Sequence, residues 1–268
     1  RLHDRRVMPR CTIAPMAPLL LALACSGEAP EDDVAAANAG GGGTGGAGGP
    51  AAVDPGATFG ETFAGVYHLG PVDWEETVWN NACAPYHPTI IAREGELLAG
   101  LETGHLDGGR LCDACVLITT AEGTQANVRV VTYGDTGPND IDLSPAACAE
   151  LTGDAGCDVW PREMTWQFAR CPDVGPIAYQ FQTEASVWWT SFWVRAARLP
   201  LVSVEVKSQN HPEFTALTWA SDGTLTDAAG FGEGEFSLRL TAADGQTLTD
   251  RFPGFEPGAL LESSGQFR

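Results

Sequence analysis

The stretch from Val128 to Pro145 constrains the fold of this chain more than any other part of its sequence. It predicts an apolar strand, a polar loop, and a short helix over 145–151 with Ser144 as its N-cap. The loop contains three carboxylates, Asp135, Asp140 and Asp142. If the chain has a reactive or polymer-binding centre, we expect Asp142 to lie in it. The simpler alternative is that the carboxylates solvate a turn and cap the following helix.

Short apolar runs separated by Gly, Pro and Asp predict a mainly β protein. Strands are expected at 116–119, 128–131 and 165–168. Beyond a turn-rich hinge at 172–176, alternating apolar residues predict strands within 177–182, 201–206 and 236–241, and Asp244-Gly245 predicts a hairpin turn. We therefore expect two compact domains, of which the first ends near Cys171 and the second is a small antiparallel sandwich.

Residues 1–25 have the pattern of a secretion signal, because arginines precede an apolar run that stops at Cys25. The segment resembles a bacterial lipoprotein signal in which Cys25 is lipidated; the alternative is an ordinary cleaved signal peptide. Residues 26–56 are rich in glycine and poor in apolar side chains, so we expect a flexible tether. The chain is expected to be secreted or displayed at the cell envelope, touching a membrane only through the lipid anchor.

The formal net charge of −20 argues against nucleic-acid partners, since an acidic surface repels phosphate backbones. An uncharged polysaccharide is compatible with this charge.

Six cysteines remain after Cys25, and an even number predicts disulfides in an exported protein. Zinc at Cys112 and Cys115 is the weaker alternative, because no second Cys or His pair has suitable spacing. These two cysteines are too close to bridge each other comfortably in a strand, so each is expected to join a distant partner. We expect no metal and no cofactor.

Four tryptophans of the second domain are candidates for either a core or a binding face. Trp188 and Trp189 are neighbours, so a strand would expose one of them and a bulge would expose both. Exposed indoles can stack on sugar rings. We expect this role for Trp188, Trp189 and Trp219, and burial for Trp193. Tyr67 could donate its hydroxyl to a groove; the alternative is a half-buried tyrosine.

Several segments together resemble bacterial expansin-like proteins. They are 109–116, 138–145 with its Asp-Leu-Ser-Pro motif, 166–171, and 179–189 with its Trp-Trp pair. The resemblance spans nearly the whole chain from about residue 57. It implies a six-stranded double-psi β-barrel over 57–172, followed by an immunoglobulin-like, carbohydrate-binding β-sandwich over 176–268.

The resemblance also implies a function and a set of site residues. The family loosens noncovalent contacts in plant-wall networks without measurable hydrolysis, so we expect a protein that binds cellulose or a related neutral glucan, as a monomer. The essential Asp of the family matches Asp142, and its sandwich aromatics match the three tryptophans at 188, 189 and 219. The implied disulfides are Cys83–Cys112, Cys115–Cys171 and Cys148–Cys157.

Three positions depart from the family pattern. Val66 replaces a groove Thr, Tyr133 replaces an Asp, and Gln182 replaces a Lys of the sandwich face. Asp135 is the candidate to substitute for the missing carboxylate. Two alternatives therefore stay open: a glycan-cleaving barrel enzyme acting on cellulose or peptidoglycan, with Asp142 and Asp135 as its carboxyl pair, and a pure carbohydrate-binding protein whose groove has decayed.

Overall fold

The structure is a computed structural model that describes residues 58–70, 72, 81–87, 89, 96–106, 109–134, 137–153, 156–157, 162–173 and 175–268. These residues lie in one compact unit of the chain. The expected signal at 1–25, the lipidation site Cys25 and the tether at 26–56 lie outside the described residues. In the part of the chain that is described, no helix has both the length and the apolar character to cross a bilayer.

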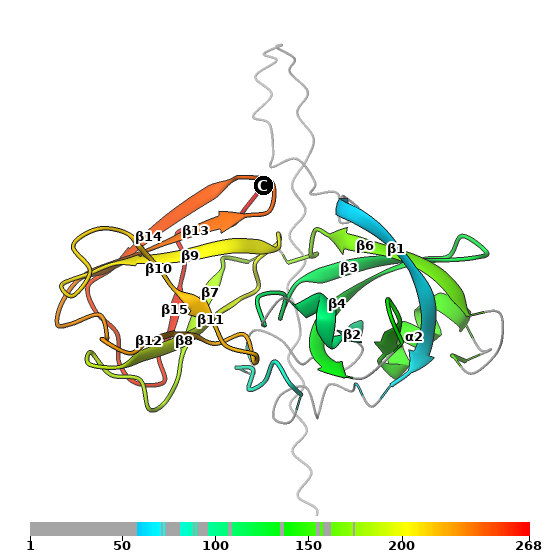
Figure 1. The fold of residues 1–268 in the computed structure, drawn as a ribbon, viewed down its shortest axis with the longest axis horizontal. Coiled ribbons are helices and arrows are strands. Elements are labelled where there is room, and N and C mark those ends of the chain that lie inside the picture. Colours follow the sequence, from blue (N-terminus) through cyan, green and yellow to red (C-terminus); the bar gives the residue numbers. More distant parts are fainter. Residues whose placement is uncertain are drawn as a thin grey trace, which may run out of the picture. The chain divides into compact units, whose positions relative to one another are not determined.

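Six strands close into a barrel in the order β1-β5-β2-β4-β3-β6 (Figure 1). Their bounds are β1 Thr58–Leu69, β2 Leu98–Glu102, β3 Cys115–Thr120, β4 Gln125–Gly134, β5 Ile141–Leu143 and β6 Glu163–Ala169. The β1–β5 and β2–β4 pairs are parallel, and the other four pairs are antiparallel. The mixed, closed, six-stranded barrel expected from the resemblance is confirmed.

Among the described residues, two short helical segments accompany the barrel strands, the 3₁₀-helix η1 (Thr103–Leu106) and the helix α2 (Pro145–Thr152). Ser144 is the N-cap of α2, and its Oγ accepts the N–H of Ala147 at 3.2 Å. The same oxygen accepts the N–H of Leu98 at 3.1 Å, so the cap also ties the helix to β2. The helix predicted at 145–151 is confirmed.

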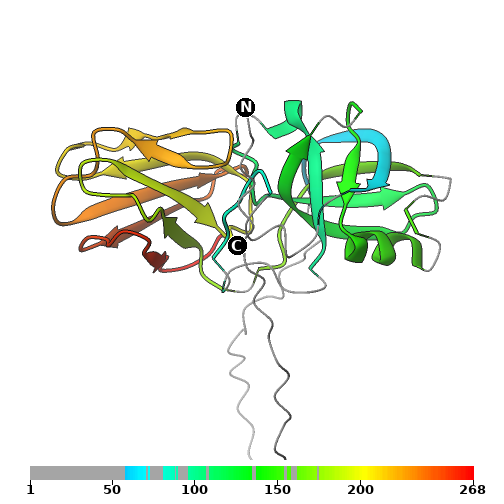
Figure 2. The same ribbon diagram turned by 90° about the horizontal axis from the view of Figure 1, so that it is seen from below.

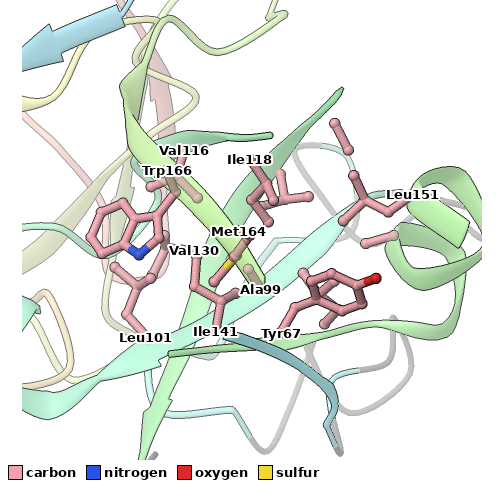
Figure 3. Close-up of a cluster of buried hydrophobic side chains, with 14 of the residues drawn as sticks. Tyr67, Ala99, Leu101, Val116, Ile118, Val130, Ile141, Leu151, Met164 and Trp166 are labelled. Atoms are coloured by element: carbon pink, nitrogen blue, oxygen red, sulfur yellow. The ribbon is translucent and has the colours of Figure 1, made fainter. Parts of the chain in front are cut away.

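Apolar side chains from all six strands and from α2 fill the barrel (Figure 3). Their alternation along the strands matches the period of a half-buried sheet. Trp166 is 1% exposed and stacks on Phe63 with ring centroids 4.4 Å apart. In Figure 3, the Trp166 ring lies at one side of the labelled cluster, and Tyr67 and Leu151 lie toward the other side.

The rest of the chain forms two antiparallel sheets that face each other as layers (Figures 1 and 2). One sheet has the order β10-β9-β13-β14 and the other β11-β12-β8-β7-β15. The bounds are β7 Ala178–Phe181, β8 Thr190–Arg195, β9 Leu201–Lys207, β10 Thr215–Ala216, β11 Thr218–Trp219, β12 Leu225–Asp227, β13 Phe236–Ala242, β14 Thr247–Phe252 and β15 Leu260–Glu262. The expected antiparallel sandwich is confirmed.

Phenylalanine rings from both sheets dominate the sandwich core. Phe181 stacks on Phe192 at 5.1 Å and on Phe255 at 4.3 Å, and its ring meets Phe236 of the opposite sheet edge-on at 6.1 Å. Trp193 is 3% exposed, as expected. The hairpin predicted at Asp244-Gly245 joins β13 to β14, and Gly245 adopts a φ of 87° there.

The three disulfides implied by the resemblance are present: Cys83–Cys112, Cys115–Cys171 and Cys148–Cys157. They join residues 29, 56 and 9 positions apart in the sequence. Each restricts the unfolded chain and thereby stabilises the fold by roughly 2 to 4 kcal/mol. All six of these cysteines lie at or near the barrel.

The segment 81–87 packs against the sandwich through a buried arginine. Arg195 of β8 is 1% exposed, and its Nη2 donates to the carbonyls of Cys83 at 2.9 Å and Pro85 at 3.0 Å. Its guanidinium also lies over the ring of Tyr86, 3.9 Å from the centroid. The planar, permanently charged group of arginine can serve these partners together, which a lysine could not.

A second buried arginine, Arg129, forms ion pairs with three carboxylates beside the barrel. Arg129 of β4 donates from Nη2 to both carboxylate oxygens of Asp173, at 2.7 and 2.8 Å, and from Nε to Glu96 at 3.3 Å. Asp113 lies 3.6 Å away. Burial alone would lower the pKa of Arg129, but the charges of Asp173 and Asp113 outweigh it and raise that pKa. The arginine stays charged and holds three carboxylates.

We predict that Arg129→Ala lowers the free energy of unfolding by about 3 to 5 kcal/mol, because it leaves buried carboxylates without their cation. Urea unfolding followed by far-UV circular dichroism measures the change. The matched control is Arg239→Ala, which breaks a bidentate pair with Glu205 that is open to solvent. Equal losses in the two variants would contradict the assignment of Arg129 as a buried structural charge.

Candidate functional site

The register between β1 and β5 decides which side chains face out of the barrel at the acidic loop. Tyr67 pairs with Ile141, and His68 pairs with Asp142. Ile141 is 0% exposed in the barrel core, so Tyr67 points inward with it while His68 and Asp142 point outward. Tyr67 is itself 3% exposed and packs in that core (Figure 3). This burial favours the alternative of a core tyrosine, and a role for its hydroxyl in a groove stays a prediction.

Asp142 lies on the outer side of β5 between two glycines. A Cβ at Gly70 would lie 2.5 Å from the Cβ of Asp142, and one at Gly100 would lie 3.6 Å from it. Partial burial raises the pKa of the Asp142 carboxyl above its ordinary value, the nearby His68 opposes that change, and the charge of Asp140 adds to it. Asp142 thus holds its proton more readily than an exposed aspartate does.

His68 is a neighbour of Asp142 that sequence reasoning missed. Its Nδ1 lies 3.2 Å from Nη1 of Arg162. Arginine only donates, so Nδ1 accepts, and the ring proton is then on Nε2, which lies 3.7 Å from the Oδ2 of Asp140. The side chain is 35% exposed. The alternation of Val66, Tyr67 and His68 along a strand was the signal that could have revealed it.

Asp140 has a structural role that separates it from Asp142. Its Oδ1 accepts the N–H of Val66 at 2.9 Å, and its own N–H donates to the carbonyl of Gly137 at 2.9 Å. It therefore joins the loop to β1. The third loop carboxylate, Asp135, lies outside the described residues. Among the described loop carboxylates, Asp142 is the one with a raised pKa and a place on the outer side of its strand.

Asn139 fixes the turn that precedes Asp142. It adopts a φ of 63°, a left-handed conformation that asparagine tolerates. Its carbonyl accepts the indole N–H of Trp166 at 2.8 Å, and its Oδ1 lies 2.8 Å from Nε2 of His105. His105 meets Trp166 edge-on at 5.0 Å. The acidic loop is thereby anchored to the barrel core through an aromatic cluster.

The tryptophan pair of the sandwich is exposed, but not through a bulge. Trp188 is 67% exposed and Trp189 is 38% exposed. The N–H of Ser186 donates to the carbonyl of Trp189 at 2.8 Å, and the N–H of Trp189 donates back at 3.3 Å. The two indoles therefore lie in a tight turn before β8, where the in-and-out alternation of a strand does not apply.

Trp219 does not share this exposure. Its side chain is only partly exposed and packs against the apolar core of the sandwich. The expectation that it forms a third platform beside Trp188 and Trp189 is not supported by its packing. In the described part of the chain, no group of three or more His, Cys, Asp or Glu side chains is arranged to hold a metal ion.

We predict opposite stability effects for the two neighbouring carboxylates. Because the pKa of Asp142 is raised in the folded state, its ionised form destabilises the fold, so Asp142→Asn should unfold at higher urea than the unmodified protein at pH 7. This gain should shrink as the pH falls through the raised folded-state pKa and vanish below about 3.9, where the wild-type carboxyl is protonated in both states. Asp140→Ala should instead lose about 1 to 3 kcal/mol, since the Val66 amide loses its acceptor. A destabilised Asp142→Asn at pH 7 would contradict this assignment.

Comparison with known proteins places these features in context. No protein-family model matches the chain. Two expansin-like proteins of Dictyostelium discoideum are similar in sequence: Expansin-like protein 6 at 22% identity and Expansin-like protein 3 at 25%, each over 177 residues and 64% of this chain. The matches cover 61% and 51% of those relatives, so the chain spans little more than half of their length.

Solved structures give a wider match. The crystal structure of an expansin from Clavibacter michiganensis superposes with a TM-score of 0.62 at 18% identity, covering 78% of this chain and 98% of that one. A mutant of the same expansin in complex with cellohexaose gives the same TM-score at 19% identity and the same coverage. The chain therefore has the fold of a bacterial expansin, and its sequence is similar to two expansin-like proteins.

Proposed function

We propose that this protein binds cellulose or a related neutral glucan through Trp188 and Trp189 and loosens noncovalent polysaccharide contacts without hydrolysis. The observation that carries the proposal is the exposed tryptophan pair held in a tight turn. A structural neighbour with this fold was solved in complex with cellohexaose, which supports a glucan as the ligand.

The chemistry of the pair suits an uncharged, flat-faced ligand. Indoles stack on the apolar faces of sugar rings and contribute through desolvated area rather than charge. The net charge of −20 would repel an acidic polymer but leaves a neutral glucan unaffected. Binding to cellulose is therefore expected to change little between low and high salt.

The barrel would supply the loosening step through Asp142. A carboxyl can accept hydrogen bonds from glucan hydroxyls when ionised and donate one when protonated. Because the pKa of Asp142 is raised, its protonated and ionised forms coexist at a higher pH than those of an exposed aspartate. His68 lies on the same outward face. On this proposal, the groove competes for the hydrogen bonds that join one glucan chain to its neighbours.

A glycan-cleaving enzyme is the second candidate, favoured by the same raised pKa, because a general acid needs a carboxyl that keeps its proton. An inverting hydrolase also needs a second carboxylate roughly 6.5 to 9.5 Å away. Asp140 is engaged with the Val66 amide, so this role would fall to Asp135. Peptidoglycan is the alternative substrate of such an enzyme.

Export belongs to the same proposal. Three disulfides in the described chain are typical of an oxidising compartment. We propose a monomeric protein at the cell envelope, held by a lipid on Cys25 and acting without a cofactor. A pure carbohydrate-binding role, with a groove that no longer works, differs from this proposal only in the loosening step.

We predict that Trp188→Ala with Trp189→Ala weakens cellulose binding by about 100-fold, on the basis of roughly 1.4 kcal/mol for each stacked ring. Depletion of the mature protein from solution by microcrystalline cellulose measures the affinity. Val202→Ala is the matched control, because it removes another exposed apolar side chain of the sandwich, which is 46% exposed. Unchanged affinity in the double variant would remove the basis of the binding proposal.

A single assay series separates loosening from cleavage. The protein is incubated with cellulose and with peptidoglycan, and reducing ends, soluble muropeptides and the tensile strength of cellulose paper are measured. We predict weaker paper without soluble sugar, and loss of the weakening in Asp142→Ala with cellulose binding retained. Soluble sugar that disappears in Asp142→Ala would establish the enzyme instead.

A further inference from the structure

The turn that carries the two indoles rests on a second loop of the sandwich. The N–H of Gly232 donates to the carbonyl of Val187 at 2.8 Å. A Cβ placed on Gly230 would overlap the Val187 carbonyl oxygen and would lie 2.5 Å from the carbonyl carbon of Trp188 and 2.6 Å from its Cα. The backbone beneath Trp188 therefore packs on a position that has no room for a side chain.

A buried hydroxyl joins the same two loops. Thr190 is 0% exposed, and its Oγ1 donates to the carbonyl of Ser186 at 3.0 Å. The same oxygen accepts the N–H of Phe231 at 3.2 Å. Phe231 is 1% exposed in the sandwich core. The start of the tryptophan turn is thus fixed to a residue that cannot move without disturbing the core.

The second loop, which connects β12 to β13, is also held by contacts with His211 and Asn210. Nε2 of His211 lies 2.6 Å from Oδ2 of Asp227, whose other oxygen accepts the N–H of Ala229 at 3.1 Å. The side-chain amide of Asn210 donates to the carbonyls of Ala229 at 3.0 Å and Gly230 at 2.9 Å. These contacts hold the loop at Asp227, Ala229 and Gly230, so the position of Gly230 is set before any ligand arrives.

We propose that Gly230 is a positioning residue for glucan binding: its bare backbone sets the height and tilt of the Trp188–Trp189 turn. The inference rests on the proposed function, because it concerns the same platform. Stacking on a flat polymer face requires both rings to meet that face together. A small displacement of the turn therefore costs affinity even though both indoles remain present.

Gly230→Ala tests the proposal against a glycine with the same conformational demand. Gly230 has a φ of 67° and Gly245 a φ of 87°, but a Cβ on Gly245 would meet nothing within 4 Å. Both alanines bear a similar left-handed strain, and only one displaces the turn. We expect Gly230→Ala to weaken cellulose binding at least fivefold and Gly245→Ala to leave it unchanged. Equal affinities in the two variants, whether both fall or neither does, would overturn the proposal.

A second pair of variants decides the matter if Gly230→Ala does not fold. Thr190→Val removes the hydroxyl that joins the two loops, and Thr190→Ser keeps it. We expect the valine variant to bind cellulose at least fivefold more weakly and the serine variant to restore most of the affinity. Valine and serine variants that bind alike would overturn the proposal.

A spectroscopic readout separates this inference from the proposed function. Gly230→Ala should change the near-UV circular dichroism of the indoles in the wild-type background, but not in a background that carries Trp188→Ala and Trp189→Ala. If the wild-type chain fails to bind cellulose, the proposed function falls and this spectral dependence still reports the positioning. If the chain binds but the spectral change is the same in both backgrounds, the positioning role is overturned.

Discussion

The parallel pairing of β1 with β5 is the constraint on which the barrel site depends. β5 has only three residues, and its two outer members are fully buried, so its middle residue must face outward. That residue is Asp142, and the same register places His68 beside it. A slip of one residue in this pairing would bury the Asp142 carboxylate and expose the two apolar side chains of β5. Both changes would raise the free energy of the folded state, so the register is strongly specified. The Asp140 contact with the Val66 amide fixes that register from the loop side.

The exposed tryptophan pair of the sandwich, the proposed binding platform, is positioned in a different way. Its exposed rings owe their position to a turn that packs on backbone, not to a strand that presents alternate side chains. Backbone packing of this kind leaves little freedom, because hydrogen bonds and van der Waals contact act on the same atoms. The imidazole of His211 contacts Asp227, and the amide of Asn210 donates to the carbonyl of Gly230, so these polar groups fix the shape of the loop. The ligand-facing surface can therefore stay apolar in a strongly acidic protein.

Sequence patterns predicted β3, β4, β6, β7, β9, β13, the helix α2 and the sandwich, because apolar periodicity and capping act locally. The strands β1 and β5, which position Asp142, were not among the predicted strands. The disulfide pairs and Asp142 followed from the family resemblance, and the disulfides are confirmed. Alternation along β1 indicates only that Tyr67 and His68 face opposite sides. That His68 lies beside Asp142, and Tyr67 beside the buried Ile141, depends on the register of β1 with β5, which a linear pattern does not contain. The exposure of Trp188 together with its neighbour depended on a turn that has no glycine or proline within it to announce it.

The two sites have opposite physical characters, and on the proposed function this difference matters. Stacked rings hold a neutral polymer without charge, so affinity does not require the groove to bind tightly. The groove can then keep a carboxyl that is poorly solvated and costs stability, because tight capture is achieved elsewhere. A permanently ionised carboxylate would keep its hydrogen bond to one glucan hydroxyl and would not exchange it for another. A carboxyl with a raised pKa and a histidine beside it can exchange hydrogen-bond partners, which is what separating one glucan chain from another requires.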